Sequence, residues 1–478
     1  DWNPYAKAAA NNFRLPSIMH SPDLIALGEF KPSDQWQTHV NSIFYGIKGP
    51  EIHNHFQTYV SLDHRLAYAL AEDFFKHTVG KKPEGRVWTI QEWGVGNGNL
   101  AGCFLSRLQE IDFNQQVYPF IHYILCDESE EILKGARANL RLQKHEGRFS
   151  TVKIHAEHLD CFRSNSVTKI ISNEIWDDLA TKVLLKKEKQ FYEEYLCPHL
   201  PPDFPGVNEK VFLQQFQNKD LLELAQRPSF LEAIYWERDF QRVELSDWPF
   251  SNTLKKHSQN LKDEIPMPIN TGAFAALKKA RELLAPDNLG YTGFDYGMLD
   301  LKDLNQEGRP YFNLYGGQYT FMVNFPLLQE VGLEIGFSEV NREYQNDFVK
   351  RSLDSEVSGV VDLVQNHPQA ANMLGWDRDI LMLRTLQALN TVYHSPYSGK
   401  LEYPPMPGTP KKQRKQILQL VKNLSARGVP DTVAYVTKEE VFAALKPLRK
   451  LGYREKDIET AFHSPPQPVS FIHIQFKD

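Results

Sequence analysis

The chain has 478 residues, about three times the ~150 residues of an average domain. Hydrophobic residues make up 41% and aromatic residues 12%, which excludes a disordered chain, and no apolar run reaches the roughly 18 residues of a membrane-spanning helix. The net charge of −6, without a long basic tract, argues against a nucleic-acid-binding protein. The four cysteines form no CxxC pair, which favours a reducing compartment: Cys103, Cys126, Cys161 and Cys197. Together these features predict a cytoplasmic protein with no membrane or nucleic-acid partner.

Residues 1–80 are predicted to form a helical N-terminal cap, because apolar residues between Val60 and Phe75 recur at near-helical spacing. Short apolar segments then alternate with helical ones, which is typical of a parallel sheet covered by helices on both faces. Strands are expected at Val87–Ile90, Ile121–Cys126, Thr151–His155, Val167–Ser172, Gly290–Tyr296, Gly332–Val340 and Val469–Phe476.

The sequence therefore predicts one α/β core that carries three additions. The core is assigned to residues 81–196, 271–344 and 461–478. An insertion is assigned to residues 197–270. It opens with Cys197–Val207, where four prolines argue against any regular element. Residues 345–460 are predicted to form a mostly helical insertion, or lid.

A glycine cluster lies between the first predicted core strand and the helix after it. Glu92 precedes Gly94, Gly96 and Gly98 in the run EWGVGNG. Glycines let the backbone turn tightly and approach a ligand, and the helix offers unpaired N–H groups at its first turn. The third glycine comes one position early for a dinucleotide site. An acid two residues before GxGxG is the form that holds S-adenosylmethionine, although a tight turn without a ligand is the alternative interpretation.

Two acids follow the second predicted core strand. A carboxylate at the end of this strand can accept hydrogen bonds from both ribose hydroxyls of a nucleoside. Asp127 is the first candidate for this contact and Glu128 is the second. Taken alone, either residue could instead cap the helix that follows.

Asn173, Glu174 and Asp177 follow the fourth predicted core strand. Ligands of doubly wound sheets bind at the carboxyl ends of the strands. Carboxylates three residues apart can face one point across a helical turn. We therefore expect Glu174 and Asp177 to bind a cationic acceptor or accept a proton, with a capped, solvated helix start as the alternative.

These motifs together resemble the MidA-like family of S-adenosylmethionine-dependent methyltransferases, which includes a mitochondrial complex I assembly factor that methylates a protein arginine. The resemblance extends over nearly the whole chain, in the family's order. It is carried by Glu92–Gly98, Asp127–Ser129, Asn173–Asp177, Phe56-x-Thr58, Asp295–Gly297, Gly317-x-x-Thr320-x-x-Val323-x-Phe325, Tyr344-Gln345-x-x-Phe348 and Val469–Phe476.

The resemblance implies a class I, Rossmann-like methyltransferase fold with S-adenosylmethionine as the cofactor. It assigns the cofactor to Glu92, Gly94, Gly96, Gly98, Asp127, Glu128 and Asn173. We expect Glu174, Asp177 and the strand end at Asp295 and Tyr296 to surround the acceptor and carry catalysis, with Tyr59 and Gln345 as second-choice contacts. This chain departs from the family in two acceptor-side segments, Thr58–Ser61 and Phe321–Asn324, of which the second lacks the family's histidine and carboxylate.

These departures, the insertions and the start at Asp1 without a methionine suggest a domain of a larger assembly. Our first hypothesis is methylation at carbon, with or without decarboxylation, of an acyl group tethered to an acyl carrier protein in a polyketide synthase-type assembly. The second is N-methylation of a protein substrate at arginine or another side chain. The third is a non-catalytic assembly factor. The sequence does not define the oligomeric state.

Two weaker features complete the sequence. The basic run Lys411–Lys415 is expected to be a solvated helix start, with the docking of an acidic partner as the alternative. No metal site is expected, because the histidines lack the spacing of a known metal motif: His53, His55, His155, His158 and His199.

Overall fold

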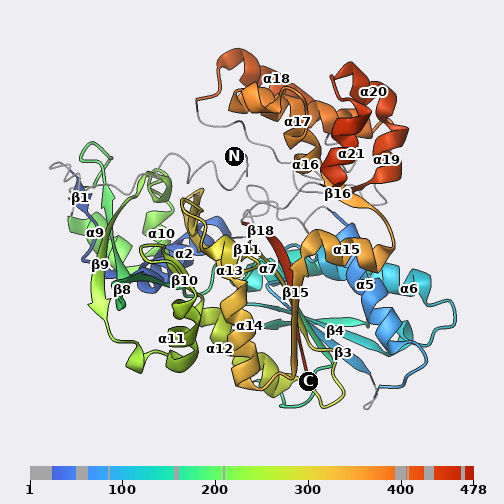
Figure 1. The fold of residues 1–478 in the computed structure, drawn as a ribbon, viewed down its shortest axis with the longest axis horizontal. Helices are drawn as coiled ribbons and strands as arrows, with labels where there is room; N and C mark the ends of the chain where they lie inside the picture. Colours follow the sequence, from blue (N-terminus) through green and yellow to red (C-terminus); the bar gives the residue numbers. More distant parts are fainter. Residues whose placement is uncertain are drawn as a thin grey trace. The chain divides into compact units, whose positions relative to one another are not determined.

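The computed structural model describes residues 24–49, 63–83, 87–155, 161–207, 210–392, 405, 408–424, 435–463 and 469–478. The chain divides into two compact units (Figure 1). The first unit consists of Asp1–Gly49, Ile154–Tyr344 and Gln467–Asp478. The second consists of Pro50–Lys153 and Gln345–Pro466.

The second unit begins with three parallel strands in the order β3-β4-β5: β3 (Trp88–Trp93), β4 (Ile121–Asp127) and β5 (Phe149–Lys153). They are joined by α6 (Asn99–Ile111), η2 (Tyr118–Phe120), α7 (Glu130–Arg137) and α8 (Leu140–Gln143). Nearly every residue of β3 and β4 is buried, because helices cover these strands. Helix α5 (Arg65–Thr78) packs against α6 and against α15 (Gln345–Leu353).

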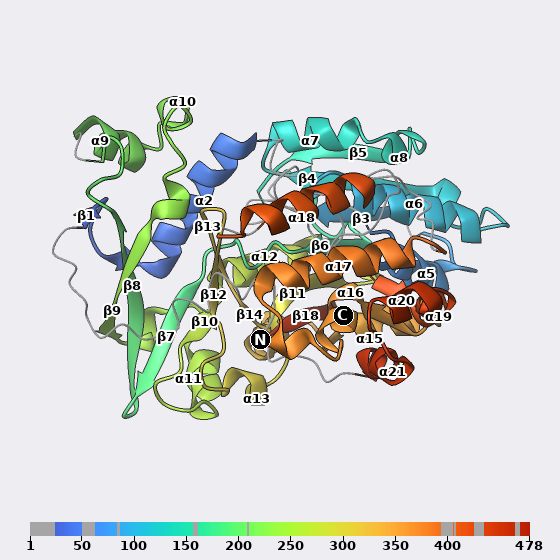
Figure 2. The ribbon, with the colours of Figure 1, turned by 90° about the horizontal axis from the view of Figure 1, so that it is seen from above.

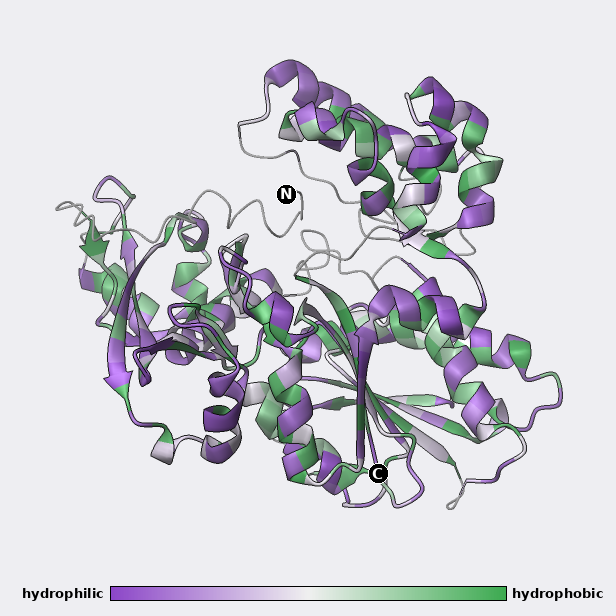
Figure 3. Ribbon diagram, viewed as in Figure 1, coloured by the Kyte–Doolittle hydropathy of each residue, from purple (hydrophilic) through white to green (hydrophobic). Residues whose placement is uncertain are grey.

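The later part of the second unit is helical in its described residues, apart from a short antiparallel ladder. The ladder pairs β16 (Val357–Gly359) with β17 (Tyr435–Thr437). The helices are α16 (Val360–Gln365), η5 (Ala370–Asn372), α17 (Gly375–Leu389), α18 (Lys411–Leu424), α19 (Lys438–Ala443), α20 (Leu445–Lys450) and α21 (Glu455–His463). Helix α18 packs on α17 and is coloured mostly as hydrophilic in Figure 3.

The first unit contains a mixed sheet in the order β15-β18-β11-β6, with β14 pairing β11. Its strands are β6 (Lys169–Asn173), β11 (Tyr291–Met298), β14 (Val323–Asn324), β15 (Glu339–Tyr344) and β18 (Ser470–Lys477). β11 runs parallel to β6 and β14, whereas β18 is antiparallel to both of its neighbours. Helix α14 (Phe325–Ile335) packs on this sheet and on α12 (Thr271–Leu283), and all eight residues of β11 are buried.

The first unit also contains an antiparallel sheet, in which β7 and β8 form a long hairpin (Figure 2). Its strands are β1 (Ile25–Ala26), β2 (Lys31–Pro32), β7 (Lys182–Lys187), β8 (Gln190–Leu200), β9 (Tyr235–Val243) and β10 (Met267–Ile269). Trp36 of α2 (Ser33–Lys48) joins this sheet in a core with Phe216 of α9 (Lys210–Asn218). The same core includes Tyr319 from the hairpin of β12 (Phe312–Tyr315) and β13 (Gln318–Phe321).

The remaining elements of the first unit are short. They are α10 (Leu221–Leu224), η3 (Leu231–Ala233), η4 (Leu245–Asp247), α11 (Ser251–Gln259) and α13 (Leu301–Leu304). In the part of the chain that the structure describes, no helix combines the length and the apolar character that crossing a membrane requires.

The α/β class is confirmed, but two local predictions are wrong. The expected strand Gly332–Val340 is instead the end of α14 followed by β15 from Glu339, because Asn324 caps a helix at Phe325. Cys197–Leu200, expected to be irregular, closes β8. Pro198 lies in this strand opposite Trp236 of β9, and its carbonyl accepts a hydrogen bond of 2.8 Å from Leu27 N–H.

Candidate functional site

The glycine loop joins β3 to α6 in the second unit, as the sequence predicts. Gly94, Gly96 and Gly98 all have positive φ angles, of 73°, 52° and 73°. This left-handed conformation disfavours any side chain. At Gly98 a Cβ would also lie 3.1 Å from Cβ of Ala136, so the glycine permits close packing of α6 on α7.

Glu92 lies in β3, just before this loop, and is almost completely buried. Tyr123 of the neighbouring strand donates a hydrogen bond of 2.7 Å from its hydroxyl to Oε2 of Glu92. Burial raises the pKa of Glu92 to about 8, and the nearby Asp127 carboxylate adds to the shift. No cation pairs with Glu92 among the residues that the structure describes. The carboxyl group can therefore pair with a cationic ligand group, which would favour its ionised form.

The two candidate ribose acids at the end of β4 lie in different environments. Asp127 is buried, and its Oδ1 accepts a hydrogen bond of 2.9 Å from Ser129 N–H. Burial raises the pKa of Asp127 to about 6. Hydrogen bonds from backbone N–H groups, including that of Val95 in the glycine loop, partly offset this rise. Asp127 therefore ties β4 to this loop. Glu128 is exposed, so its carboxylate can approach a ligand from solvent.

The acceptor-side motif begins at the end of β6 in the first unit. The Asn173 amide donates a hydrogen bond of 3.0 Å to Oε1 of Glu174. Glu174 has a φ of 51°, a left-handed conformation that costs a non-glycine residue about 1–2 kcal/mol. The strained turn is held by a hydrogen bond of 2.8 Å from Glu174 N–H to the Phe294 carbonyl of β11.

Asp295 of β11 organises the backbone beyond this turn. Its Oδ2 accepts hydrogen bonds from the N–H groups of Trp176 at 2.9 Å and Asp177 at 3.3 Å. Its Oδ1 accepts one from Tyr296 N–H at 2.8 Å. The side chain is fully buried. These contacts make Asp295 a positioning residue for the motif, while its predicted contact with an acceptor stays a prediction.

Asp177 and Tyr296 are brought together as the sequence predicts. The Tyr296 hydroxyl donates a short hydrogen bond to Asp177 Oδ2 and lies 3.0 Å from Thr320 Oγ1 of β13. The second carboxylate oxygen of Asp177, Oδ1, is buried and accepts no hydrogen bond from the described residues. A buried acceptor atom without a donor is costly, which makes this oxygen a candidate for contact with a ligand or a proton.

Burial raises the pKa values of all three groups in this cluster. Asp177 reaches a pKa of about 7, because burial and the Glu174 charge outweigh the hydrogen bond from Tyr296. The pKa of Asp295 lies well above its usual value through burial and the Asp177 and Glu174 charges. Burial and the Asp177 charge raise the pKa of Tyr296 as well. A carboxylate with a pKa near 7 suits general base catalysis at neutral pH.

Helix α2 holds the Asp177–Thr181 segment through three polar residues at four-residue spacing. Gln37 donates to the Asp177 carbonyl at 2.9 Å and accepts from Thr181 N–H at 2.9 Å. Asn41 donates to Asp178 at 3.2 Å. Tyr45 donates to the other oxygen of the same carboxylate. This spacing puts all three side chains on one face of the helix.

The β12–β13 hairpin contacts the same segment from another side. Phe321 N–H donates to the Asp177 carbonyl at 3.0 Å. The Gln318 amide donates to both carboxylate oxygens of Asp178, at 2.6 and 2.7 Å. Asn41 forms hydrogen bonds of 2.9 and 2.8 Å with the N–H and carbonyl of Tyr319. The acceptor-side motif is therefore fixed by α2, β11 and β13 together.

Sequence reasoning did not assign roles to Thr320 or to the polar face of α2. The four-residue spacing of Gln37, Asn41 and Tyr45 was the available signal. In the departing segment Phe321–Asn324, Asn324 caps α14 by accepting a hydrogen bond of 3.1 Å from Leu327 N–H. It has a structural role where the family has a carboxylate.

Several predicted features lie elsewhere or outside the described residues. Tyr59, Phe56, Thr58, His53, His55 and His158 fall outside them. In the described ranges, no three His, Cys, Asp or Glu side chains come together as a metal site. Lys411–Lys415 begins α18 and its basic side chains are exposed.

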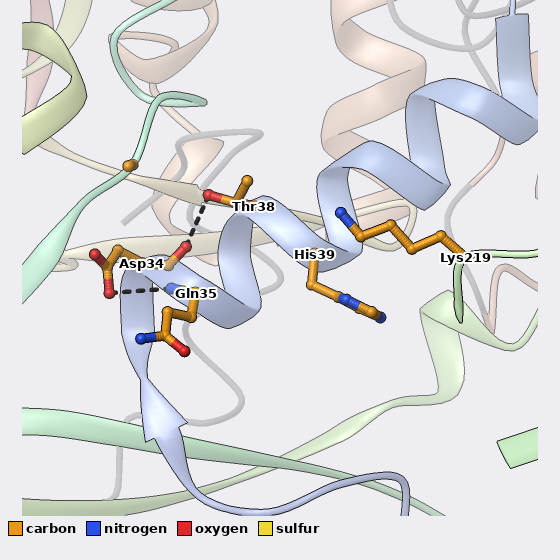
Figure 4. A pocket seen from close by; sticks show the side chains of 6 residues that line it. Asp34, Gln35, Thr38, His39 and Lys219 are labelled. Carbon is orange, nitrogen blue, oxygen red and sulfur yellow. Dashed lines mark hydrogen bonds between the residues drawn. The ribbon is translucent and has the colours of Figure 1, made fainter. Parts of the chain in front are cut away.

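A shallow pocket of about 300 Å³ lies beside α2, separate from the predicted site residues (Figure 4). It is lined by Asp34, Gln35, Thr38, His39, Ala180 and Lys219. Burial lowers the pKa of His39 to about 4, and the Lys219 charge adds to this shift. The imidazole is thus neutral at physiological pH.

Residues 70–306, about half of the chain, match a family model described as "Putative S-adenosyl-L-methionine-dependent methyltransferase". No curated protein matches the chain. A COG1565 superfamily protein from Burkholderia thailandensis is 14% identical, with a TM-score of 0.46, over 72% of this chain and 80% of that one. A second such protein from that organism, bound to S-adenosylhomocysteine, is 11% identical, with a TM-score of 0.45, over 94% and 88%.

The residues of the second unit fit the cofactor that this family uses. The buried Glu92 carboxyl can pair with the ammonium group of the methionine part, and the left-handed glycines leave room for it beside the helix start. An acid at the end of β4 can bind the ribose. The fold is the Rossmann-like fold of class I methyltransferases. The chain belongs to the MidA-like family of S-adenosylmethionine-dependent methyltransferases, as a divergent member.

Proposed function

We propose that this enzyme methylates the carbon next to the carbonyl of an acyl group carried by an acyl carrier protein, with Asp177 as the general base. The observation that carries the proposal concerns the two carboxylate oxygens of Asp177. Oδ2 accepts a hydrogen bond from Tyr296, whereas the buried Oδ1 has no donor among the described residues. A base at this atom is held in a fixed orientation and has a pKa of about 7.

The proposed reaction has two steps: Asp177 removes a proton from the acyl group, and the methyl group of the cofactor is then transferred to carbon. Asp177 Oδ1 takes a proton from the acyl α-carbon, and the electron pair of the broken C–H bond forms an enolate. The cofactor supplies an electrophilic methyl group on a sulfonium. The enolate carbon forms the new C–C bond while the methyl–sulfur bond breaks toward sulfur, leaving neutral S-adenosylhomocysteine. For a malonyl-type acyl group, loss of carbon dioxide can form the enolate without the base.

A basic stripe on α18 supports a carrier protein as the bearer of the acyl group. We define this stripe as Lys411, Lys415, Leu418 and Lys422, which are exposed and recur on one face of the helix. Helix α18 contains no acidic residue, so its positive charge is not offset within the helix. The exposed Leu418 lies between Lys415 and Lys422 along this face. Such a surface complements the acidic, amphipathic surface of a carrier protein.

Methyl transfer from labelled S-adenosylmethionine to malonyl- and acetoacetyl-loaded carrier protein tests this function. We expect label in both acyl groups for wild type and none in the acetoacetyl group for D177N, because only that group depends on a base to form its enolate. The matched docking variant K411E/K415E/K422E should raise KM for the carrier protein at least tenfold at low salt, while KM for a short acyl thioester stays unchanged. Absence of label in every acyl substrate would contradict the proposal.

N-methylation of an arginine side chain is the second candidate. The gathering of Glu174, Asp177 and Asp295 around one site favours a cationic acceptor. The Glu174 charge raises the pKa of Asp177, both charges raise that of Asp295, and a guanidinium would relieve this repulsion. The same assay with an arginine-bearing protein distinguishes the two. Label on arginine alone would show that the acceptor is a guanidinium nitrogen and not a carbon atom.

A further inference from the structure

One hydroxyl hydrogen at the acceptor-side cluster lies between two acceptors. The Tyr296 hydroxyl is hydrogen-bonded to Asp177 Oδ2 and lies 3.0 Å from Thr320 Oγ1. A phenol has a single O–H hydrogen, so Tyr296 donates to only one of these oxygens at a time. Both neighbours, Asp177 and Thr320, are buried.

The charge on Asp177 decides which oxygen receives the hydrogen. An ionised Asp177 can only accept, so Tyr296 donates to it and Thr320 must donate to the phenol oxygen. A protonated Asp177 can donate through Oδ2 to Tyr296. Tyr296 then donates to Thr320, whose oxygen becomes an acceptor. The two arrangements use the same three side chains with every hydrogen bond reversed.

We propose that Thr320 is a positioning residue for methyl transfer, which acts through Tyr296 to keep Asp177 ionised as the general base. A threonine hydroxyl that donates to the phenol oxygen polarises its O–H bond and strengthens donation to the carboxylate. The inference rests on the proposed role of Asp177 in proton removal. Thr320 lies on β13 and Tyr296 on β11, so a residue of a second strand sets the direction of this hydroxyl chain.

The other groups around Asp177 do not replace this donor. Glu174 on its own turn and Asp295 on β11 are acids, and both oppose ionisation of Asp177 or compete with it for charge. From α2, Gln37 reaches the Asp177 backbone carbonyl and not the carboxylate. From β13, Phe321 N–H does the same. The backbone N–H groups of Asp177 and Asp178 also favour the ionised carboxylate, but among the described residues it is Tyr296 that supplies its side-chain hydrogen bond.

Infrared spectroscopy of the Asp177 carboxyl tests the inference without an acceptor. The band is identified as the difference between each protein and its D177N derivative, and is followed from pH 5 to pH 9. T320V keeps the shape of threonine without the hydroxyl, and T320S keeps the hydroxyl. We expect T320S to titrate as wild type, T320V to titrate about half a pH unit higher, and Y296F at least about one unit higher. A T320V midpoint equal to that of wild type would overturn the proposal.

Kinetics with the acceptor that proves to be methylated supplies the second readout. The acidic limb of kcat/KM should move to higher pH in T320V and return in T320S, while KM for S-adenosylmethionine stays the same in all three proteins. Thermal unfolding checks that T320V is folded. The failure of the proposed function has its own signature, since D177N would then keep full turnover whatever the infrared midpoints show. An acidic limb that does not move in T320V overturns the proposal.

Discussion

At the scale of single residues, the two most informative groups are buried acids with no cation beside them in the part of the chain that the structure describes. Asp177 should be ionised above pH 7, where it can accept a proton, and protonated below. We expect methyl transfer to fall as the pH drops through about 7, since the base is lost. D177N should lower kcat at least about 100-fold with unchanged binding of S-adenosylhomocysteine in calorimetry. A variant that loses binding and turnover together would assign Asp177 to the cofactor instead.

Glu92 gives a second prediction at this scale. Its pKa of about 8 means that the carboxyl is mostly protonated at pH 7, and pairing with the cofactor ammonium should ionise it. Binding of S-adenosylmethionine at pH 7 should therefore release close to one proton. Calorimetry in buffers of different ionisation enthalpy measures this number. E92Q should bind without proton release and at least about tenfold more weakly, and an unchanged release in E92Q would exclude Glu92 as the source.

The glycine loop allows a matched pair of stability variants. G98A forces a side chain into a φ of 73° and within 3.1 Å of Ala136, so it should lower the free energy of unfolding by about 1–3 kcal/mol. Gly135 lies on the adjacent helix α7, where an added Cβ meets nothing within 4 Å. G135A should raise the same free energy by about 0.5–1 kcal/mol. Denaturant unfolding measures both.

At the scale of elements, local patterns were predictable and long-range support was not. The turn between β3 and α6 follows from a β-favouring run, glycines and an amphipathic helix, all within about 25 residues. Asp177 and Tyr296 were also predicted, because Asp177 follows an apolar strand and Tyr296 ends one. The role of Thr320 depends on a partner 24 residues away in β11, and Asn41 reaches residues 137 and 278 positions distant. Spacing along the sequence carries no signal for such contacts.

The strand errors have the same origin. An apolar stretch such as Gly332–Val340 suits both a strand and a helix, and the deciding cap at Asn324 lies outside the stretch. The prolines of Cys197–Val207 indicated a break. Pairing of β8 with β1 and β9 nevertheless carries the strand through Pro198 to Leu200.

Helix α2 provides the prediction for this scale. N41L removes three hydrogen bonds to Tyr319 and Asp178 in a buried position, and should lower the free energy of unfolding by about 2–4 kcal/mol. It should also lower kcat more than KM for the cofactor, because the segment that carries Asp177 loses its support. S42A, an exposed position on the same helix, is the control. Equal effects of the two variants would show that α2 does not support this segment.

At the scale of the whole molecule, the buried ionisable groups predict a stability maximum in mildly acidic solution. Asp63, Glu92, Asp127 and Asp177 have pKa values raised by burial to about 6, 8, 6 and 7. Their stabilising contribution is complete below pH 4 and is lost as the pH rises through 6 to 8. Burial lowers the pKa values of three histidines to about 3 to 4: His39, His64 and His145. The contribution of these neutral histidines to the free energy of unfolding is lost as the pH falls below 6.5.

Above about pH 5 the loss from these four acids exceeds the gain from the three histidines, because the native state holds more protons than the unfolded state. Tm of the protein without cofactor is therefore expected to fall from pH 5 to pH 8 in a buffer series. Bound S-adenosylmethionine should flatten this fall by stabilising the ionised Glu92. A Tm that rises steadily to pH 8 would contradict this account.

Strand β18 has a consequence for biosynthesis. It lies between β11 and β15 and buries Ile472, Ile474 and Phe476 completely, although it is formed by residues 470–477. A ribosome that has released β6, β11 and β15 has therefore produced β11 and β15 with an open gap between them. The nascent chain stays exposed to chaperones and proteases at this gap until β18 emerges from the exit tunnel and fills it.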